Sequence, residues 1–562
     1  MSIKVLCNVK RQNNLPGSFL AIKFTNKFNE EHIYLFPTKY LLNQRLLKEW
    51  FVEHHFDLPP DDEWEKISVL LKQKIDITGE IVDRIGFFGN SYLLPDGTII
   101  GEQKNHLLFL DPVRAKQLPD FSASGSLEDW KNNIASAGEC SSRIMLGICN
   151  GFSGYLLKIT DIENGGFHIH GISSSGKTTS EKIVVSISGP ISNLRTWNIT
   201  ETGAEELACS FNYNCLTLDE LKASDQDPKV AAKKRETISY RLCSGIEKKR
   251  GSNFKPDQLQ WRNVIFSTGE ESLEKQAQNG GIDRLDGDKV RIIDVPADAG
   301  QGMGIFETLP PNFSNASDYA IHLADQVQKY YGTAQIAFLE KFVADLNDES
   351  AEIPIKVQVN KWIKKFIRKQ EVDLDNGIEV RFASRFALAC AAGLLGVKYG
   401  ILPLTSDQIY RGISKCYRDA LAFRPETWIQ RFVRYDDGLV SYLDSNEFPV
   451  LESKKTWSPA ALDMIDRLVL TINDINVIAI KPETFENQEL VSPSDLTKFC
   501  KQLALKGFLL LDGSTNNTRQ ISYKGIKIGR FHCFVWQRND ESIEAAKMLN
   551  KSYAEKKGAK RG

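Results

Sequence analysis

The chain has 562 residues, of which 42% are hydrophobic and 25% charged, and its formal net charge is -1. This length suggests about three to five domains, and the composition is that of a soluble globular protein with sizeable cores. A near-neutral charge excludes a general affinity for polyanions, so any nucleic-acid binding has to come from local basic patches.

The cysteine usage and the apolar runs predict a cytoplasmic protein without a membrane span. The ten cysteines are spread singly, with no CxxC pair and no Cys/His cluster of zinc spacing. No basic-then-apolar leader follows Met1. The longest apolar run, Phe386–Val397, is too short for a membrane span, and we expect it to be a packed core helix.

The first 120 residues predict a mixed α+β domain. Short apolar runs alternate with amphipathic stretches, and Pro95-Asp96-Gly97 is a turn signal. The expected strands are Ser18–Phe24, Ile33–Phe36 and the short runs within Ile81–Ile100, and the expected helices are Leu41–His54 and Trp64–Ile75.

Residues 121–310 predict a parallel α/β sheet. A helical stretch, Leu127–Leu157, is followed by short apolar runs that are separated by helical patterns, which is typical of such a sheet. The strand candidates are Phe167–Ile172, Asn214–Leu218, Val264–Phe266 and Val290–Val295.

The remainder of the chain predicts a helical lid, a small second module and a tail. Residues 311–436 read as helices, and 437–545 as helices followed by two short runs, Gly507–Leu511 and Arg530–Trp536. That order fits a winged-helix-like module. The basic tail, 546–562, is expected to be disordered.

The run GISSSGKT at Gly171–Thr178 fits the P-loop pattern GxxxxGK[ST] at every fixed position. Successive backbone N–H groups in such a loop point at phosphate oxygens, and the helix N-terminus adds positive partial charge. We expect Lys177 to reach the β- and γ-phosphates and Thr178 to offer its hydroxyl to Mg²⁺. The alternative, a chance glycine turn, leaves the flanking strand and helix unexplained. The predicted nucleotide-binding residues are Gly171, Ser173, Ser174, Ser175, Gly176, Lys177, Thr178 and Thr179.

A second motif, NCLTLDE, ends an apolar strand in two acidic residues. Asp219 is predicted to be the Mg²⁺-side carboxylate, and Glu220 the base that polarises the attacking water. Adjacent carboxylates at a strand end also occur as a solvated turn, but their position after the P-loop favours the functional interpretation. ATP and Mg²⁺ are therefore the expected cofactors.

Two further positions fit a phosphoryl-transfer site. Ser267 and Thr268 follow the strand Val264–Phe266, where a hydroxyl can orient the water or report on the γ-phosphate; a Ser-Thr-Gly turn is the alternative. Arg291 opens the run VRIIDVP. Arginine suits transferring phosphoryl charge, often from a neighbouring subunit, although a lone arginine is more often a surface ion-pair partner.

The order of these motifs resembles the domain of unknown function 927 family, which comprises helicase-like proteins of phages, plasmids and integrative elements. Some members are related to MCM-type replicative helicases of the AAA+ class. The resemblance covers roughly residues 80–430 and is carried by GSLEDW, GFSGYLL, GFHIHGISSSGKTT, TWNITETGAE, LTLDEL, WRNVIFSTGEESL and VRIIDVPAD.

The resemblance implies an AAA+ ATPase with an α-helical lid that forms a hexameric ring and translocates on DNA. The chain departs from the family at CSGIEKKRG, where members usually show GxGKxR. Carried over by position, the resemblance implies that Lys177 and Thr178 belong to the first nucleotide motif and Asp219 and Glu220 to the second. It implies that Thr268 or Ser267 is the sensor and that Arg291 is the trans-acting arginine finger. Arg381 or Arg385 would then be the second sensor.

Lys248, Lys249 and Arg250 are the candidate DNA-binding residues. They lie between the second motif and the sensor strand, where MCM-like ATPases insert a pore hairpin, and they would track the phosphate backbone of single-stranded DNA. A solvated loop is the alternative. The basic stretch Lys361–Lys369 is expected to be a core-packed helix with a solvated face.

The leading hypothesis is an ATP-dependent DNA helicase or translocase of a mobile element. Its expected partners are single-stranded or forked DNA and five further copies of the chain, with a primase or initiator of the same element as a further candidate. The second hypothesis is an ATP-gated origin-binding initiator or loader that unwinds little. A small-molecule P-loop kinase is a third, disfavoured by the long helical region and the C-terminal module.

Overall fold

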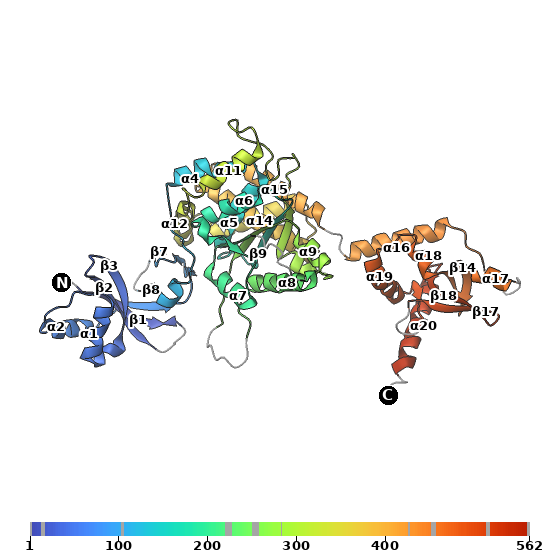
Figure 1. Ribbon diagram of the computed structural model, residues 1–562, viewed down its shortest axis with the longest axis horizontal. Helices are drawn as coiled ribbons and strands as arrows, with labels where there is room; N and C mark the ends of the chain where they lie inside the picture. Colours follow the sequence, from blue (N-terminus) through green and yellow to red (C-terminus); the bar gives the residue numbers. More distant parts are fainter. Residues whose placement is uncertain are drawn as a thin grey trace. The chain divides into compact units, whose positions relative to one another are not determined.

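A computed structural model describes residues 3–12, 17–102, 106–219, 227–249, 258–282, 284–424, 428–450, 457–512 and 517–558. Contacts divide the chain into two units, Met1–Arg424 and Pro425–Gly562 (Figure 1). Glu220 and Arg250 lie outside the described residues.

The first unit begins with a five-stranded sheet of order β3-β2-β1-β4-β8. Helices α1 (Gln44–Glu53) and α2 (Glu63–Leu71) contribute Trp50 and Trp64 to a core on this sheet. The predicted strands and helices of this region are confirmed, whereas β1 and β8 were not expected from the sequence. The strands are β1 (Lys4–Arg11), β2 (Ser18–Thr25), β3 (Glu31–Pro37), β4 (Thr78–Val82) and β8 (His106–Leu110).

A three-stranded antiparallel sheet joins this region to the following core. It consists of β5 (Gly86–Phe88), β6 (Ser91–Leu93) and β7 (Ile99–Ile100). Tyr92 is fully buried in the large core of the first unit, and the Asn212 side chain donates a hydrogen bond to the carbonyl of Ile85 (2.8 Å).

The central sheet has the order β10-β11-β12-β9-β13, and all its strand pairs are parallel. The predicted parallel sheet is confirmed, and each of the four predicted strands is present. In this order β12 lies between β9, which leads into the P-loop, and β11, which ends at Asp219. The bounds are β9 (Gly165–His170), β10 (Arg195–Thr196), β11 (Cys215–Asp219), β12 (Val264–Gly269) and β13 (Ile292–Pro296).

Helices pack against this sheet around a single core that extends from Val82 to Ala420. The core does not break at residue 310, so the described helices after β13 are continuous with the sheet domain. The helices before β13 are α3 (Pro112–Ala115), α4 (Leu127–Asn133), α5 (Ser142–Leu156), α6 (Lys177–Ser186), α7 (Glu201–Ser210), α8 (Pro228–Ser244), α9 (Leu273–Asn279) and α10 (Asp286–Lys289). The helices after β13 are α11 (Ala316–Gln326), α12 (Thr333–Asn347), α13 (Ile355–Lys369), α14 (Gly377–Lys398) and α15 (Ser406–Phe423).

Helix α14 is the one helix of the described residues that is long and apolar enough to cross a membrane, but 72% of its most apolar window is buried inside the protein. It packs against α5, α13 and α15, as expected for a core helix. Helix α13 confirms the predicted amphipathic pattern, because Ile363 and Phe366 are buried while Lys364 and Lys365 are exposed.

The second unit is an α+β module with the sheet order β14-β15-β18-β16, and β17 pairs with β18. Separate cores, containing Ile478 and Val477 respectively, show that both faces of the sheet are covered. Its elements are α16 (Trp428–Ser445), α17 (Pro459–Asp463), β14 (Arg467–Ile472), β15 (Ile475–Ile480), α18 (Pro482–Glu486), α19 (Pro493–Lys506), β16 (Leu509–Leu510), β17 (Arg519–Tyr523), β18 (Ile526–Val535) and α20 (Asp540–Gly558).

Two sequence expectations for this unit are wrong. The hairpin β14–β15 was not predicted, although its turn, Asn473-Asp474, has the positive φ angles that such a two-residue hairpin requires. The tail is not disordered from residue 546, because α20 continues to Gly558 and the Asn550 side chain bonds to the backbone of Ala504, Leu509 and Leu511.

We expect Gly166→Ala to destabilise the first unit by about 3 kcal/mol, because a Cβ at this position would overlap the backbone carbonyl of Ile265 on β12. Gly287→Ala is the control, since no heavy atom lies within 4 Å of its Cβ position. Urea unfolding of both variants measures the difference. Equal stabilities would contradict the close approach of β9 and β12.

Candidate nucleotide site

The P-loop lies at the edge of the central sheet where the parallel strands end. Its first residue is anchored by Gly171 N–H, which donates to the carbonyl of Gly269 (3.1 Å). The His170 carbonyl accepts from Ala297 N–H (2.7 Å), and the Ser175 carbonyl from Ile305 N–H (3.0 Å). The loop is therefore held between β12 and the segment that follows β13.

The P-loop turns into α6 at Gly176, whose φ of 90° is a conformation that glycine adopts readily. No side chain caps this helix N-terminus. The Lys177 ammonium folds back and donates to the carbonyls of Gly171 and Ile172, both at 2.7 Å. Ser173, Ser174 and Thr178 are exposed, whereas Ser175 and Thr179 are partly buried.

Asp219 and Thr268 lie level with each other at the same edge. Leu218 pairs with Ser267 in the β11–β12 register, and Thr268 pairs with Ile169 in the β12–β9 register. Asp219 is partly exposed and Thr268 is buried. The structure thus brings Asp219 and Thr268 to the edge that carries the P-loop.

The motif analysis missed Glu181, which α6 buries completely beside these residues. Burial and then the charge of Asp219 raise the pKa of this carboxyl well above its usual value, while hydrogen-bond donation from Thr268 opposes the shift. Neither carboxyl oxygen has a partner in good hydrogen-bonding geometry within the described part of the chain. The signal available in the sequence was the position of Glu181 on the helix that follows the P-loop, four residues after Lys177.

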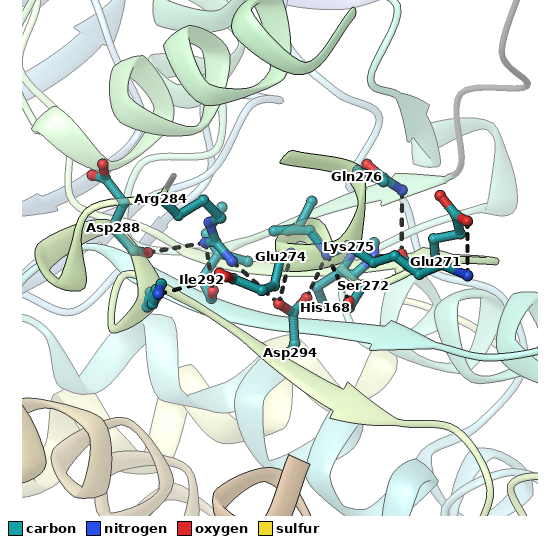
Figure 2. Close-up of polar contacts among 12 residues, drawn as sticks. His168, Glu271, Ser272, Glu274, Lys275, Gln276, Arg284, Asp288, Ile292 and Asp294 are labelled. Carbon is teal, nitrogen blue, oxygen red and sulfur yellow. Dashed lines mark hydrogen bonds and ion pairs between the residues drawn. The ribbon is translucent and has the colours of Figure 1, made fainter. Parts of the chain in front are cut away.

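Ser267 and Thr268, the two sensor candidates, face opposite sides of β12, as successive strand residues must. The Ser267 hydroxyl lies 2.8 Å from Nδ1 of His168, whose Nε2 lies 3.1 Å from the carbonyl of Glu271 (Figure 2). A carbonyl can only accept, so Nε2 carries the proton and Nδ1 accepts from Ser267. Burial lowers the pKa of His168 to about 4, so the imidazole is neutral.

Figure 2 also shows a network of polar contacts that joins Asp294, Arg284 and Asp288. Asp294 accepts from the backbone N–H groups of Leu273 and Glu274 at the start of α9 and pairs with Arg284 (3.2 Å). Arg284 also donates to the carbonyl of Asp288, whose carboxylate lies 2.6 Å from Arg291.

Arg291 precedes β13 and therefore lies at the sheet edge opposite to the P-loop. Its guanidinium pairs with Asp288 and stands 5.1 Å from the ring centre of Tyr240. The side chain is 32% exposed. Arg291 is thus outside the nucleotide site of its own chain and partly open at the surface.

The second-sensor candidate Arg385 lies away from the P-loop. Its buried guanidinium donates to the carbonyls of Glu163, Asn164 and Val290, at the beginning of β9 and β13. The six residues of β9 place this point about 17 Å from the P-loop. Burial lowers the pKa of Arg385 to about 10. Arg381 is exposed one helical turn earlier, and its sensor role stays a prediction.

Lys248 and Lys249 are exposed at the base of a hairpin-like segment. The Glu247 N–H donates to the carbonyl of Leu259 (2.9 Å), and the Trp261 N–H to that of Gly245 (3.0 Å). The segment leads into β12 from the edge opposite to the P-loop. Its DNA-binding role stays a prediction, and Arg250 lies outside the described residues.

Residues 12–255 match the family model "Domain of unknown function (DUF927)". This part of the chain is similar to that family. The predicted family resemblance is confirmed, and the match includes the P-loop and Asp219.

Comparison with solved structures extends the similarity beyond this domain. The structure described as "SCCmec type IV Cch - active helicase" is 17% identical, with a TM-score of 0.57, over 97% of this chain and 94% of that chain. This TM-score indicates a shared fold. The "A form apo structure of NrS-1 C terminal region" is 12% identical over 74% of this chain and 91% of that chain, and its TM-score of 0.23 is too low to indicate a shared fold. No curated protein sequence matches the chain.

Arg385→Met is expected to lower the free energy of unfolding by about 3 kcal/mol, because the substitution leaves buried carbonyls without their donor. Arg381→Met, on the exposed face of the same helix, should change it by less than about 0.5 kcal/mol. Chemical denaturation of both variants makes the comparison. An unchanged stability in Arg385→Met would show that the guanidinium does not brace the sheet.

Proposed function

We propose that the protein is an ATP-dependent DNA helicase or translocase of a mobile genetic element. The observation that carries the proposal is the single sheet edge that gathers the P-loop, Asp219 and Thr268. The strand order supports an AAA+ ATPase, because the sensor strand β12 separates the strands of the two nucleotide motifs. The shared fold with a structure described as an active helicase, together with the DUF927 match, supports the helicase reading.

The residues at this edge fit ATP and Mg²⁺. The uncapped N-terminus of α6 and the P-loop amides suit phosphate oxygens, and the oxygen donors of Thr178 and Asp219 suit a hard cation. The buried carboxyl of Glu181 beside Asp219, which has no cationic partner in the described residues, supports a positive charge at this place. Bound Mg²⁺ would neutralise charge on the β- and γ-phosphates.

In the proposed reaction the Lys177 ammonium leaves the carbonyls of Gly171 and Ile172 and binds the β- and γ-phosphates. The Thr268 hydroxyl is placed to orient the attacking water, and Glu220 is proposed as its general base. These groups position the water and stabilise the charge that develops on the transferred phosphoryl group.

Arg291 is proposed to complete the nucleotide site of a neighbouring copy in a homo-hexameric ring. Its place at the opposite sheet edge excludes contact with the P-loop of the same chain, and its partial exposure leaves it open to a partner. Arginine from a neighbouring subunit is an effective stabiliser of transferring phosphoryl charge.

Single-stranded DNA is the proposed substrate for translocation. The backbone of residues 245–247 pairs with that of residues 259–261, so the exposed Lys248 and Lys249 directly follow a paired segment. Arg250, the third proposed DNA-binding residue, lies outside the described residues. Such a cluster would contact the phosphate backbone without reading sequence.

An origin-binding initiator or loader is the second candidate function. The second unit favours it, because α19 is followed by the β17–β18 hairpin, an order that suits a winged-helix reader of duplex DNA. Tight binding to one duplex sequence without unwinding of a forked substrate would support this candidate over the helicase.

Lys177→Ala should reduce the ATPase rate by about a hundredfold or more, because the ammonium no longer binds the transferred phosphate. Lys182→Ala, on the same helix, is the control and should retain the wild-type rate. Phosphate release is measured with and without single-stranded DNA, which should stimulate the wild type. Particle mass with an ATP analogue shows whether Lys177→Ala also weakens assembly. An active Lys177→Ala variant would contradict the proposed site.

Arg291→Ala should inactivate ATP hydrolysis, and mixing it with Lys177→Ala should restore activity. The mixture contains interfaces that combine an intact P-loop with an intact Arg291, about a quarter of all interfaces in random rings. Mixing Lys177→Ala with Asp219→Asn is the matched control and should restore none, because both changes lie in the same half of the site. Failure of the first mixture to recover would exclude Arg291 as a finger acting in trans.

A further inference from the structure

Glu181 is an ionisable residue at a buried position where an apolar side chain would normally be expected. It lies four residues after Lys177 on α6, the helix that packs against β11 and β12. Its neighbours on the buried side of the helix include Ile183 and Val184. Glu181 is 0% exposed, and buried carboxylates are found almost only where they are paired or bind a metal.

Within the described residues Glu181 has no cationic partner, and the hydrogen bonds that Thr268 offers to it are outside ideal geometry. Both of its oxygens are inaccessible to solvent and lack a partner in good hydrogen-bonding geometry. A buried polar group left in this state costs about 1–3 kcal/mol, and more when it is charged. A water molecule or an ion that is not part of the chain can satisfy a group of this kind in a native fold.

The surroundings of Glu181 indicate the charge of that ligand. The charge of Asp219 acts on the Glu181 carboxyl, and Thr268 donates to it from β12. Two carboxyl groups that interact in this way repel when both are ionised. A divalent cation would turn this repulsion into attraction, since carboxylate oxygens are preferred ligands of Mg²⁺.

We propose that Glu181 is a second carboxylate of the Mg²⁺ site, acting with Asp219 to hold the cation or its water shell beside the P-loop. The inference rests on the proposed function and deepens it. Thr178 stands three positions before Glu181 on α6, so the two side chains are neighbours on the helix surface. Mg²⁺ sites in nucleotide-binding proteins typically combine one or two carboxylates with substrate phosphates and water.

The test measures Mn²⁺ binding to the full chain by electron paramagnetic resonance, with and without ATPγS. Glu181→Gln keeps the shape and loses the charge, and it should weaken Mn²⁺ binding by tenfold or more in the presence of ATPγS. Nucleotide affinity in EDTA should stay unchanged. Glu340→Gln, an exposed glutamate on α12, is the control and should bind Mn²⁺ like the wild type.

Glu181→Leu tests whether Glu181 binds the cation or only fills space in the core. If Glu181 is a ligand, Glu181→Leu should lose Mn²⁺ affinity as Glu181→Gln does. It should also unfold at a urea concentration no lower than that of the wild type. Wild-type Mn²⁺ affinity in both Glu181 variants would overturn the inference. If the wild-type chain binds no ATPγS, the proposed function is overturned instead. The role of Glu181 is then decided by comparing Mn²⁺ binding of the wild type and the Glu181 variants without nucleotide.

Discussion

The close parallel pairing of β9 with β12 and β13 is the constraint on which the rest of the first unit depends. Gly166 lets β12 approach β9, and the ladder continues to Gly269 and His170 at the edge where both strands end. Because β12 occupies this place, β11 lies one strand further from the P-loop strand. Asp219 therefore faces the phosphate loop across the end of β12, with Thr268 between them.

The two sides of β12 serve different parts of the molecule. Thr268 faces Glu181 and Asp219, while Ser267 faces His168 and the network of Asp294 and Arg284. That network continues through Asp288 to Arg291 at the opposite edge. Polar contacts thus extend from Arg291 to Asp294, which pairs with His168 in the β13–β9 register.

Sequence reasoning predicted the parts of the fold that depend on local pattern. The P-loop, the strands β9, β11, β12 and β13 and the amphipathic α13 all carry their signal within a few residues. It could not choose between Ser267 and Thr268, because the register of β12 with β9 and β11 determines which side of the sheet each side chain faces. It could not choose between Arg381 and Arg385, because an arginine that binds backbone carbonyls has the same sequence signature as one that binds a nucleotide.

Other features were beyond local pattern for different reasons. Glu181 carries no motif of its own, and only the folded sheet places it beside Asp219. Helix α20 has a charged, polar composition that resembles a disordered tail, and its order comes from tertiary contacts such as those of Asn550. The hairpin β14–β15 has a local turn signal at Asn473-Asp474, but the region was interpreted as helical and the turn was not predicted.

The folded-back Lys177 has a consequence for selectivity. Its ammonium already has two carbonyl acceptors within the loop, so an incoming anion competes with the loop for the same cation. A single phosphate or sulfate offers little beyond an exchange of one set of acceptors for another. In the proposed site a triphosphate would also bind the loop amides and the start of α6, and would gain contacts along its whole length. The proposed site would therefore favour long anions over short ones.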